Sequence, residues 1–224
     1  MKTTTKLETN SVFLRHLDIF DKKHFDNPIC IIGAGATGSF VALALAKMGM
    51  NNIKVWDDDC VEEHNFPNQL FRLEDLNSHK AERTAKIVKD FTGTRIKYHN
   101  CKYIKQPLSG IVILGVDTMK CRKSVYKVCK NTPEVEYIID PRTASEFYRV
   151  YTINMQLKTE REFYEKFFYS DENTEQEPCT AQAIIYSVLF AAGTVANQVK
   201  QILSDQDYKK EILADLSGYT FLTK

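Results

Sequence analysis

The segment from Ile31 to Ser39 reads IIGAGATGS and constrains the fold of this chain more than any other segment. Its glycines, Gly33, Gly35 and Gly38, fit the pattern G-x-G-x-x-G. In a strand-turn-helix unit the first glycine permits a tight turn, the second lets a phosphate approach the backbone, and the third lets helix and strand pack closely. The helix then offers free backbone N–H groups to an anion. The segment therefore predicts nucleotide binding without specifying the nucleotide.

The surrounding residues have the pattern of alternating strands and helices. An apolar strand over 28–32 leads into the turn, a helix over 40–48 ends at Gly49, and a second strand covers 51–56. The later elements expected are helices over 80–91, 122–130 and 180–203, and strands over 96–102, 110–115 and 135–140. This pattern predicts an α/β fold, with a Rossmann-like, mostly parallel sheet flanked by helices.

The C-terminal half has a different pattern. Residues 149–157 alternate in polarity, which predicts an antiparallel extension of the sheet, and residues 205–224 are expected to form one more helix and a tail. We expect a single domain over 1–224, made of an N-terminal arm (1–27), a nucleotide-binding half (28–140) and a second half (141–224).

Composition excludes several classes of function. The 30 basic and 29 acidic side chains give a net charge of +1, so the totals indicate neither a nucleic-acid partner nor a membrane partner. We find no signal peptide and no apolar run of the ~18 residues that a bilayer span needs. The six cysteines include no CxxC pair, which favours reduced thiols in a cytoplasmic protein and gives no reason to expect zinc. The aromatic residues Tyr148, Tyr151 and those of 163–169 are interpreted as core or interface.

An acidic cluster follows the second strand. Asp57 stands 19 residues after Gly38, where a carboxylate accepts hydrogen bonds from ribose hydroxyls. Asp59 is a candidate to lie near a metal or phosphate, whereas Asp58 is expected to be exposed. A solvated loop acid is the alternative interpretation of Asp57.

Polar residues suited to a triphosphate follow this cluster. The chain continues through Asn65, Asn68 and Gln69 to Lys80, and Asp117 comes after the apolar strand 110–115. Carboxyl ends of parallel strands gather ligands, which favours a functional role for that aspartate. Each of these two residues has an alternative interpretation. Lys80 could belong to a solvated helix face together with Lys86 and Lys89. Asp117 could cap the following helix, with or without a second role.

Together these residues resemble the ThiF, MoeB and ubiquitin-activating enzyme superfamily, which adenylates the C-terminal glycine of small ubiquitin-like proteins. The resemblance covers about residues 15–199 and is strongest over 31–80. The family has a glycine turn, an aspartate pair, an Asn-x-x-Arg-Gln sequence, a lysine and a later aspartate. The matching residues here are Asp57, Asp59, Asn65, Asn68, Gln69, Lys80 and Asp117.

This resemblance implies ATP and Mg²⁺ as cofactors. Asp57 would hold the ribose, Asn65 and Lys80 the phosphates, and Asp117 the magnesium ion or the reacting phosphate. It also implies a ubiquitin-like or sulfur-carrier protein as partner and a homodimer, with residues 141–224 facing the carrier and the second subunit.

The sequence departs from the family at Asn68, where relatives often have arginine. Asparagine loses the fixed charge and the bidentate geometry, so we expect Arg72 to supply the charge or the contact to be missing. By the same resemblance, Arg15 matches an arginine that crosses the dimer interface to the phosphates. A surface salt bridge is the alternative for Arg15.

Two further residues are candidates for contact with the second substrate. Cys179 lies between an acidic loop and the helix 180–203; a helix N-terminus lowers a thiol pKa, but Glu175 and Glu177 oppose this. The resemblance implies a thioester or persulfide at this cysteine, and a small helix cap is the alternative. Arg142 could orient the incoming carboxylate or bind acidic residues near it, and a structural pair with Asp140 is equally compatible with the sequence.

The predicted function is ATP-dependent adenylation of a protein carboxyl terminus. A nicotinamide-dependent oxidoreductase would explain the glycine turn and Asp57 but leaves residues 65–80 without a role. A nucleotide-binding scaffold without turnover is the third possibility, made plausible by Asn68.

Overall fold

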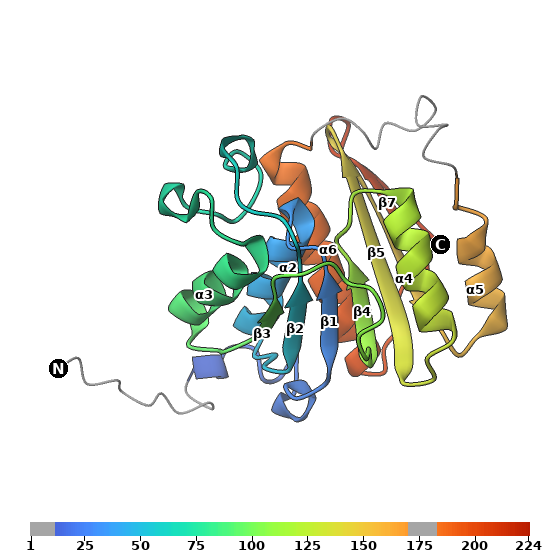
Figure 1. Ribbon diagram of the computed structural model, residues 1–224. Coiled ribbons are helices and arrows are strands. Elements are labelled where there is room, and N and C mark those ends of the chain that lie inside the picture. The colour runs from blue at the N-terminus through green and yellow to red at the C-terminus, as the bar shows by residue number, and fades with distance from the viewer. Residues whose placement is uncertain (1–11, 170–182) are drawn as a thin grey trace.

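The computed structural model describes residues 12–169 and 183–224. These residues form an eight-stranded sheet with the order β3-β2-β1-β4-β5-β6-β7-β8 and helices on both faces (Figure 1). The strands are β1 Ile29–Ile32, β2 Ile53–Trp56, β3 Lys97–His99, β4 Gly110–Leu114, β5 Val135–Ala144, β6 Phe147–Asn154, β7 Glu211–Asp215 and β8 Thr220–Thr223. Neighbours from β3 to β5 are parallel and those from β5 to β8 are antiparallel, which confirms the expected α/β fold.

Two groups of helices enclose the sheet. On one face lie α2 (Ala36–Lys47), α3 (Lys80–Thr92) and α6 (Ile185–Leu203), and on the other lie α4 (Met119–Lys130) and α5 (Lys158–Glu165) (Figure 1). Short 3-10 turns complete the chain at Lys22–His24 (η1), Glu63–Asn65 (η2) and Leu73–Asp75 (η3).

Alternation along the strands divides the core between these two faces. In β1, Ile29 and Ile31 pack with α2 and α6, whereas Cys30 and Ile32 pack with α4 and α5. Successive side chains of a strand point to opposite faces, so a strand buried on both sides is apolar throughout. Tyr148 belongs to the core on the α2 side, and Tyr151 and four of the aromatic residues of 163–169 belong to the core on the α4 side, which confirms their interpretation as packing residues; Tyr169 belongs to neither core.

The strand order places a crevice at one edge of the sheet. The chain leaves β1 toward β2 and β3, then crosses back to β4 on the other side of β1. Ligands of open α/β sheets bind at the carboxyl ends of the strands where the order reverses in this way. The turn after β1 and the turn after β4 meet at this edge, since Gly33 and Gly115 are in contact range.

The prediction for residues 205–224 was wrong. They form the hairpin β7-β8, whose first strand pairs with β6. The turn is stabilised by Asp215, whose Oδ1 accepts hydrogen bonds from the backbone N–H (3.0 Å) and hydroxyl (2.6 Å) of Ser217. Pairing with the open edge of β6 decides the conformation of this segment, and local sequence does not show that edge.

Smaller corrections concern element boundaries. Strand β5 continues past Asp140 to Ala144, so Arg142 lies inside a strand and not after its end, opposite Arg149 of β6. Among the described residues α6 begins at Ile185, and β6 ends at Asn154. Antiparallel pairing with β6 extends β5 beyond residue 140, where the sequence predicted its end.

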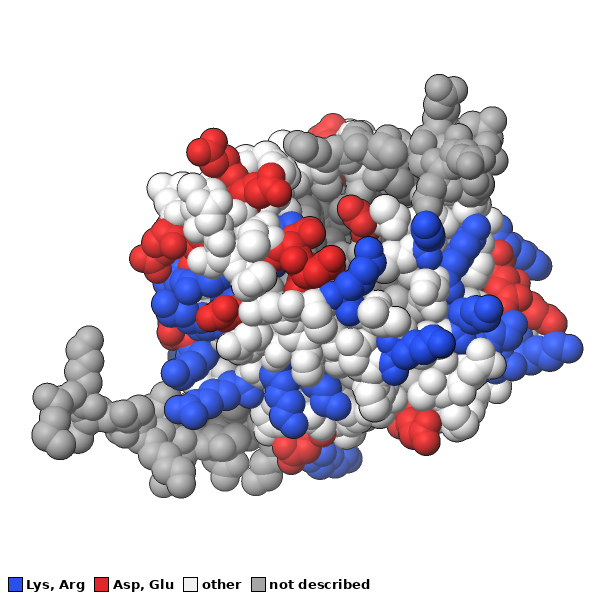
Figure 2. All heavy atoms as spheres, viewed as in Figure 1, with Lys and Arg blue, Asp and Glu red and all other residues white. Residues whose placement is uncertain are grey.

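The surface agrees with the balanced composition. Figure 2 shows Lys and Arg side chains interspersed with Asp and Glu over the visible face, in keeping with the formal charge of +1. Within 12–169 and 183–224, none of the helices combines the length and apolar character needed to cross a bilayer.

Candidate functional site

A cleft of about 500 Å³ occupies the carboxyl-end edge of the sheet. Of the residues singled out from the sequence, those lining it are Gly33, Gly35, Asp57, Asp58, Asp59, Gln69, Lys80, Asp117 and Arg142. Five others among the described residues do not line it, namely Arg15, Gly38, Asn65, Asn68 and Arg72. The strand ends therefore bring most of the candidates together, although they are spread over more than a hundred residues of sequence.

The glycines of the turn have different environments. Gly33 has a φ of +96°, and a Cβ on Gly38 would lie 1.9 Å from the carbonyl oxygen of Gly33. Gly35, in contrast, has nothing within 4 Å of the position of a Cβ. It is also the N-cap residue of α2, whose first turn is not capped by a side chain. The open side of the turn thus presents helix N–H groups to the cleft, as anion binding requires.

Asp57 is held firmly at the end of β2. Its Oδ2 accepts a hydrogen bond from the backbone N–H of Ala34 (2.6 Å) and its Oδ1 from that of Asp59 (2.8 Å). Burial raises the pKa of this carboxyl group, while the two hydrogen bonds and Lys80 partly oppose the rise. Each carboxylate oxygen has a second lone pair for a ribose hydroxyl. The carboxylate is thus part of the cleft and is not a freely solvated loop acid.

Lys80 is buried, with 8% of its surface exposed. It is the first residue of α3, and its backbone N–H donates to the carbonyl oxygen of Asp59 (3.0 Å). Its Nζ donates to the carboxylate of the same aspartate at 2.9 Å. Lys86 and Lys89 are exposed, so the interpretation of all three lysines as one solvated face was wrong. The contact with the loop after β2 turns the lysine inward, and helical periodicity does not show it.

Asp117 lines the cleft and is exposed. Its side chain makes no hydrogen bond or ion pair within the described part of the chain. The N-cap of α4 is Thr118, whose hydroxyl accepts the backbone N–H of Cys121 at 3.3 Å. The alternative in which the aspartate caps this helix was therefore wrong, and the carboxylate is available to a ligand.

The two asparagines do not line the cleft. Asn65 is 3% exposed, and its Oδ1 accepts the backbone N–H of Glu62 at 2.9 Å. The Nδ2 of Asn68 donates to the carbonyl oxygen of Ala183 at 3.0 Å, which ties the loop after β2 to the start of α6. Gln69 reaches the cleft, and its buried Oε1 has no partner among the described residues.

Arg72 does not replace the arginine that the family often has at the position of Asn68. Its guanidinium donates to Asp75 at 3.2 and 3.3 Å and lies 3.0 Å from Glu74 and 3.7 Å from Asp90. It does not line the cleft. Of the two alternatives for this position, the one in which Arg72 supplies the missing charge was wrong, because these carboxylates hold its guanidinium elsewhere.

Two other candidates are distant or outside the described residues. Arg15 is exposed and precedes β1. Its segment packs through Phe13 on Phe25, which contacts Gly49 at the amino-end edge of the sheet, opposite the cleft. Cys179 lies outside the described residues.

Trp56, Lys102 and Arg122 are among the cleft residues that were not singled out from the sequence. Trp56, the one tryptophan of the chain, stacks on His99 with ring centroids 4.7 Å apart, and its indole N–H has no partner among the described residues. Because Trp56 is the last residue of β2, directly before Asp57, its position in the sequence could have indicated that it lies at the cleft. Lys102 belongs to the loop after β3, and Arg122 is the fourth residue of α4. No local pattern indicates where that loop or that helix face lies.

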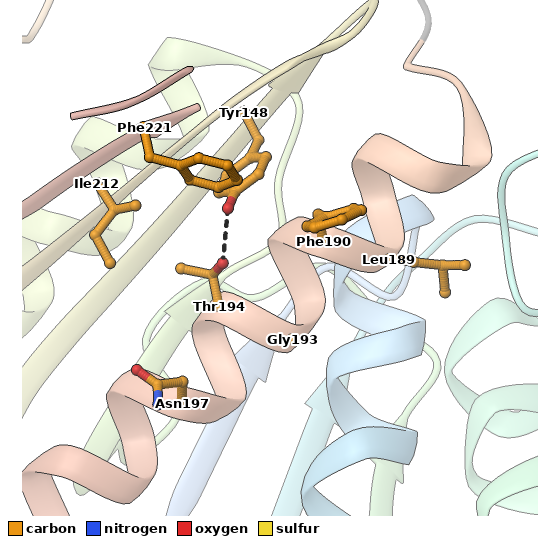
Figure 3. Close-up of a pocket in the computed structure, with 8 residues that line it drawn as sticks. All are labelled: Tyr148, Leu189, Phe190, Gly193, Thr194, Asn197, Ile212 and Phe221. Carbon is orange, nitrogen blue, oxygen red and sulfur yellow. Dashed lines mark hydrogen bonds between the residues drawn. The ribbon is translucent and has the colours of Figure 1, made fainter. Parts of the chain in front are cut away.

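A second hollow, about 560 Å³, lies between α6 and the antiparallel strands. Figure 3 shows its lining, in which the hydroxyl of Thr194 donates to Tyr148 at 3.0 Å between the apolar side chains of Phe190 and Phe221. Apart from that tyrosine its lining contains no ionisable side chain. It lacks the charged groups that phosphoryl chemistry requires.

Comparison with known proteins agrees with this geometry. Residues 20–223 match the model of the ThiF family. The chain belongs to the ThiF family. No curated protein matches. Similar solved structures include E. coli MccB with AMPCPP and MccA, at 16% identity and a TM-score of 0.73, covering 91% of this chain and 65% of that chain. Another is PaaA, at 12% identity and a TM-score of 0.76, covering 100% of this chain and 77% of that chain.

E. coli MccB with ATP is also similar (17% identity, TM-score 0.76, covering 98% of this chain and 72% of that chain). At such identities these likenesses show the fold alone. This ThiF-family chain spans slightly less than two thirds of the MccB chain with AMPCPP and MccA. Family membership supports adenylation chemistry in general.

Proposed function

We propose that this ThiF-family protein is an ATP- and Mg²⁺-dependent adenylyltransferase acting on the C-terminal carboxylate of a ubiquitin-like or sulfur-carrier protein. One observation supports this most strongly: Asp57, Lys80 and Asp117 line a single cleft beside the open N-terminus of α2. A nicotinamide enzyme needs the first of these residues but neither the buried lysine nor an aspartate that has no partner among the described residues.

Each residue has a defined role in this proposal. Asp57 accepts the ribose hydroxyls, and the N-terminus of α2 with Lys80 holds the phosphates. A carboxylate oxygen attacks the α-phosphorus, forms an acyl adenylate and releases pyrophosphate. Because the attack brings negative groups together, cations fixed in place beforehand lower its barrier. Lys80, and Lys102 across the cleft, are the lysines that line it.

The donor set of the cleft fits magnesium. Mg²⁺ prefers oxygen ligands and is usually held by one or two carboxylates together with substrate phosphates. Asp117 offers such a carboxylate, and Asp58 offers a second at the β2 side, in a group of three acids whose oxygens lie within 4.8 Å of one another. When bound, the ion would neutralise charge on the phosphates. We assign Asp117 as its ligand.

The partners belong to the same proposal. MccB has been solved with ATP, and with AMPCPP together with MccA, which supports a second partner bound beside the nucleotide here. Arg15 lies at the opposite edge of the sheet from the cleft of its own chain, so it can reach a phosphate only across a homodimer interface. Sedimentation velocity measures whether that dimer exists, and a monomer at working concentration would exclude this role.

The test is exchange of labelled pyrophosphate into ATP with a candidate carrier. We expect exchange that requires both carrier and Mg²⁺ and is lost in Asp117→Asn, and a change of Trp56 emission on ATP binding because this residue lines the cleft. An emission change with ATP but no exchange with any carrier would indicate a scaffold. A response to nicotinamide dinucleotides alone would indicate an oxidoreductase and overturn the proposal.

Transfer to Cys179 is a separate step. We propose that the activated carboxyl passes to this thiolate, forming a thioester and releasing AMP. The expected product is a carrier adduct, formed with ATP, that reducing agent cleaves and that Cys179→Ala does not form. The same adduct in the alanine variant would remove the cysteine from the mechanism without affecting the adenylation step.

A further inference from the structure

Buried polar atoms without a partner mark the ligand-facing parts of the cleft. Among the described residues that line it, three carry such an atom: the indole N–H of Trp56, the amide oxygen of Gln69 and the Nη2 of Arg142. Buried polar groups are normally hydrogen-bonded, so each exception requires an explanation. Two of the three atoms belong to neutral groups, whereas the third belongs to a permanent cation.

The guanidinium of Arg142 is fixed in place by its other atoms. Its Nε donates to Asp140 at 2.9 Å, and its Nη1 donates to the carbonyl oxygen of Phe167 at 3.3 Å. Its central carbon lies 4.9 Å from the ring centroid of Tyr151, on which the group stacks. The side chain is 4% exposed. The remaining amino group is therefore held rigidly, which lowers the entropy cost of binding a ligand.

Positive charge is in excess around this arginine. Asp140 is fully buried and contacts two guanidiniums, those of Arg142 and Arg122, and it also accepts the hydroxyl of Tyr164 at 2.8 Å. The other hydrogen bonds of Arg122 go to backbone carbonyl oxygens. Two cations thus share one carboxylate within the described residues. A buried surplus charge is costly unless an anion pairs with it, so this end of the cleft favours an anion.

The position of Arg142 and Arg122 along the cleft indicates which anion they bind. Asp57 follows β2 and Arg142 lies in β5, and β1 and β4 separate these strands in the sheet. Three strand spacings of about 4.8 Å put them roughly 14 Å apart. A nucleotide with its ribose at Asp57 and its phosphates on the turn after β1 occupies the first part of this span. The wall formed by β5 and α4 then faces the second substrate.

We propose that Arg142, supported by Arg122, binds the terminal carboxylate of the acceptor at the β5 side of the cleft. This inference rests on the proposed function and adds a residue that selects a free carboxyl terminus. Arginine suits this task because its fork matches the two oxygens of a carboxylate. A phosphate oxygen has the same chemistry, so the experiment must separate the two anions.

The probes are N-acetylglycylglycine and its C-terminal amide, titrated into the full chain loaded with AMPCPP and followed by calorimetry. The free acid is expected to bind and the amide is not. In Arg142→Gln the dissociation constant for the acid should rise about tenfold or more, since a hydrogen bond between charged groups is lost. The affinity for AMPCPP, read from Trp56 emission, should change less than about twofold, as expected where no phosphate contact is lost.

The matched control is Arg149→Gln. Arg149 of β6 lies opposite Arg142 of β5 in the sheet, and it also contacts Tyr151. It does not line the cleft. Its replacement should leave binding of the acid unchanged. Arg142→Gln leaves Asp140 paired with Arg122 and Tyr164, so the fold is expected to persist. If the glutamine variant does not fold, Arg142→Lys gives the same test, because lysine keeps the charge but lacks the fork.

Several outcomes would overturn this assignment. Equal binding of acid and amide, equal affinity of wild type and variant for the acid, or no saturable binding of the acid by the wild type each contradict it. Weaker AMPCPP or pyrophosphate binding in Arg142→Gln, with acid binding intact, would make Arg142 a phosphate ligand instead. Failure of AMPCPP to alter Trp56 emission in the wild type would reject the proposed function itself and is thus distinguishable.

Discussion

Replacing Lys80 by alanine is expected to lower carrier-dependent pyrophosphate exchange about a hundred- to a thousandfold, the effect of removing one preorganised charge contact in a transition state. The lysine is buried beside the acidic loop after β2, where its ammonium group is already held by Asp59 at 2.9 Å. Low solvent access strengthens its interaction with phosphate. Steady-state exchange, measured with saturating carrier, gives this ratio directly.

The same substitution should have little effect on stability. Asp59 is two-thirds exposed, so loss of its partner returns it to water and leaves no buried charge. We expect the free energy of unfolding to change by less than about 1 kcal/mol. Lys86→Ala, on the exposed face of the same helix, is the control and should retain full exchange. Unaltered exchange in Lys80→Ala would contradict the role of the lysine.

The two later glycines of the turn are expected to separate folding from nucleotide binding. In Gly38→Ala the new methyl group would lie 1.9 Å from the carbonyl oxygen of Gly33, so helix α2 must move away from β1. Such overpacking costs about 3 kcal/mol of unfolding free energy. In Gly35→Ala the methyl group meets no atom within 4 Å, and stability should be nearly unchanged. It projects instead where a phosphate would approach, so ATP affinity should fall about tenfold or more through lost backbone contacts.

Urea unfolding measures the first effect, and titration of Trp56 emission with ATP measures the second. Each variant is the control for the other, because both change one hydrogen atom to a methyl group in the same turn. A stable Gly38→Ala protein would show that α2 can shift at low cost. Unimpaired ATP binding by Gly35→Ala would show that phosphate does not lie over this residue.

Periodicity and strand ends allowed much of the site to be predicted. The glycine turn, the acidic end of β2 and the end of β4 are local features, and parallel topology then places Asp57 and Asp117 at one edge of the sheet. In contrast, the inward direction of Lys80 and the place of Arg142 depend on neighbours distant in sequence, Asp59 and Phe167 among them. Patterns within one helix do not show those neighbours.

The sequence by itself determined the βαβ unit, the apolar strands and the residue types suited to a nucleotide, because these follow from contacts within a few residues. Only the tertiary structure decided that β5 continues through Arg142 and that 211–223 forms a hairpin on β6. It also decided that two arginines share the single carboxylate of Asp140. The physical reason is that strand pairing and buried charge balance depend on which segments meet in space, and local preferences do not encode that.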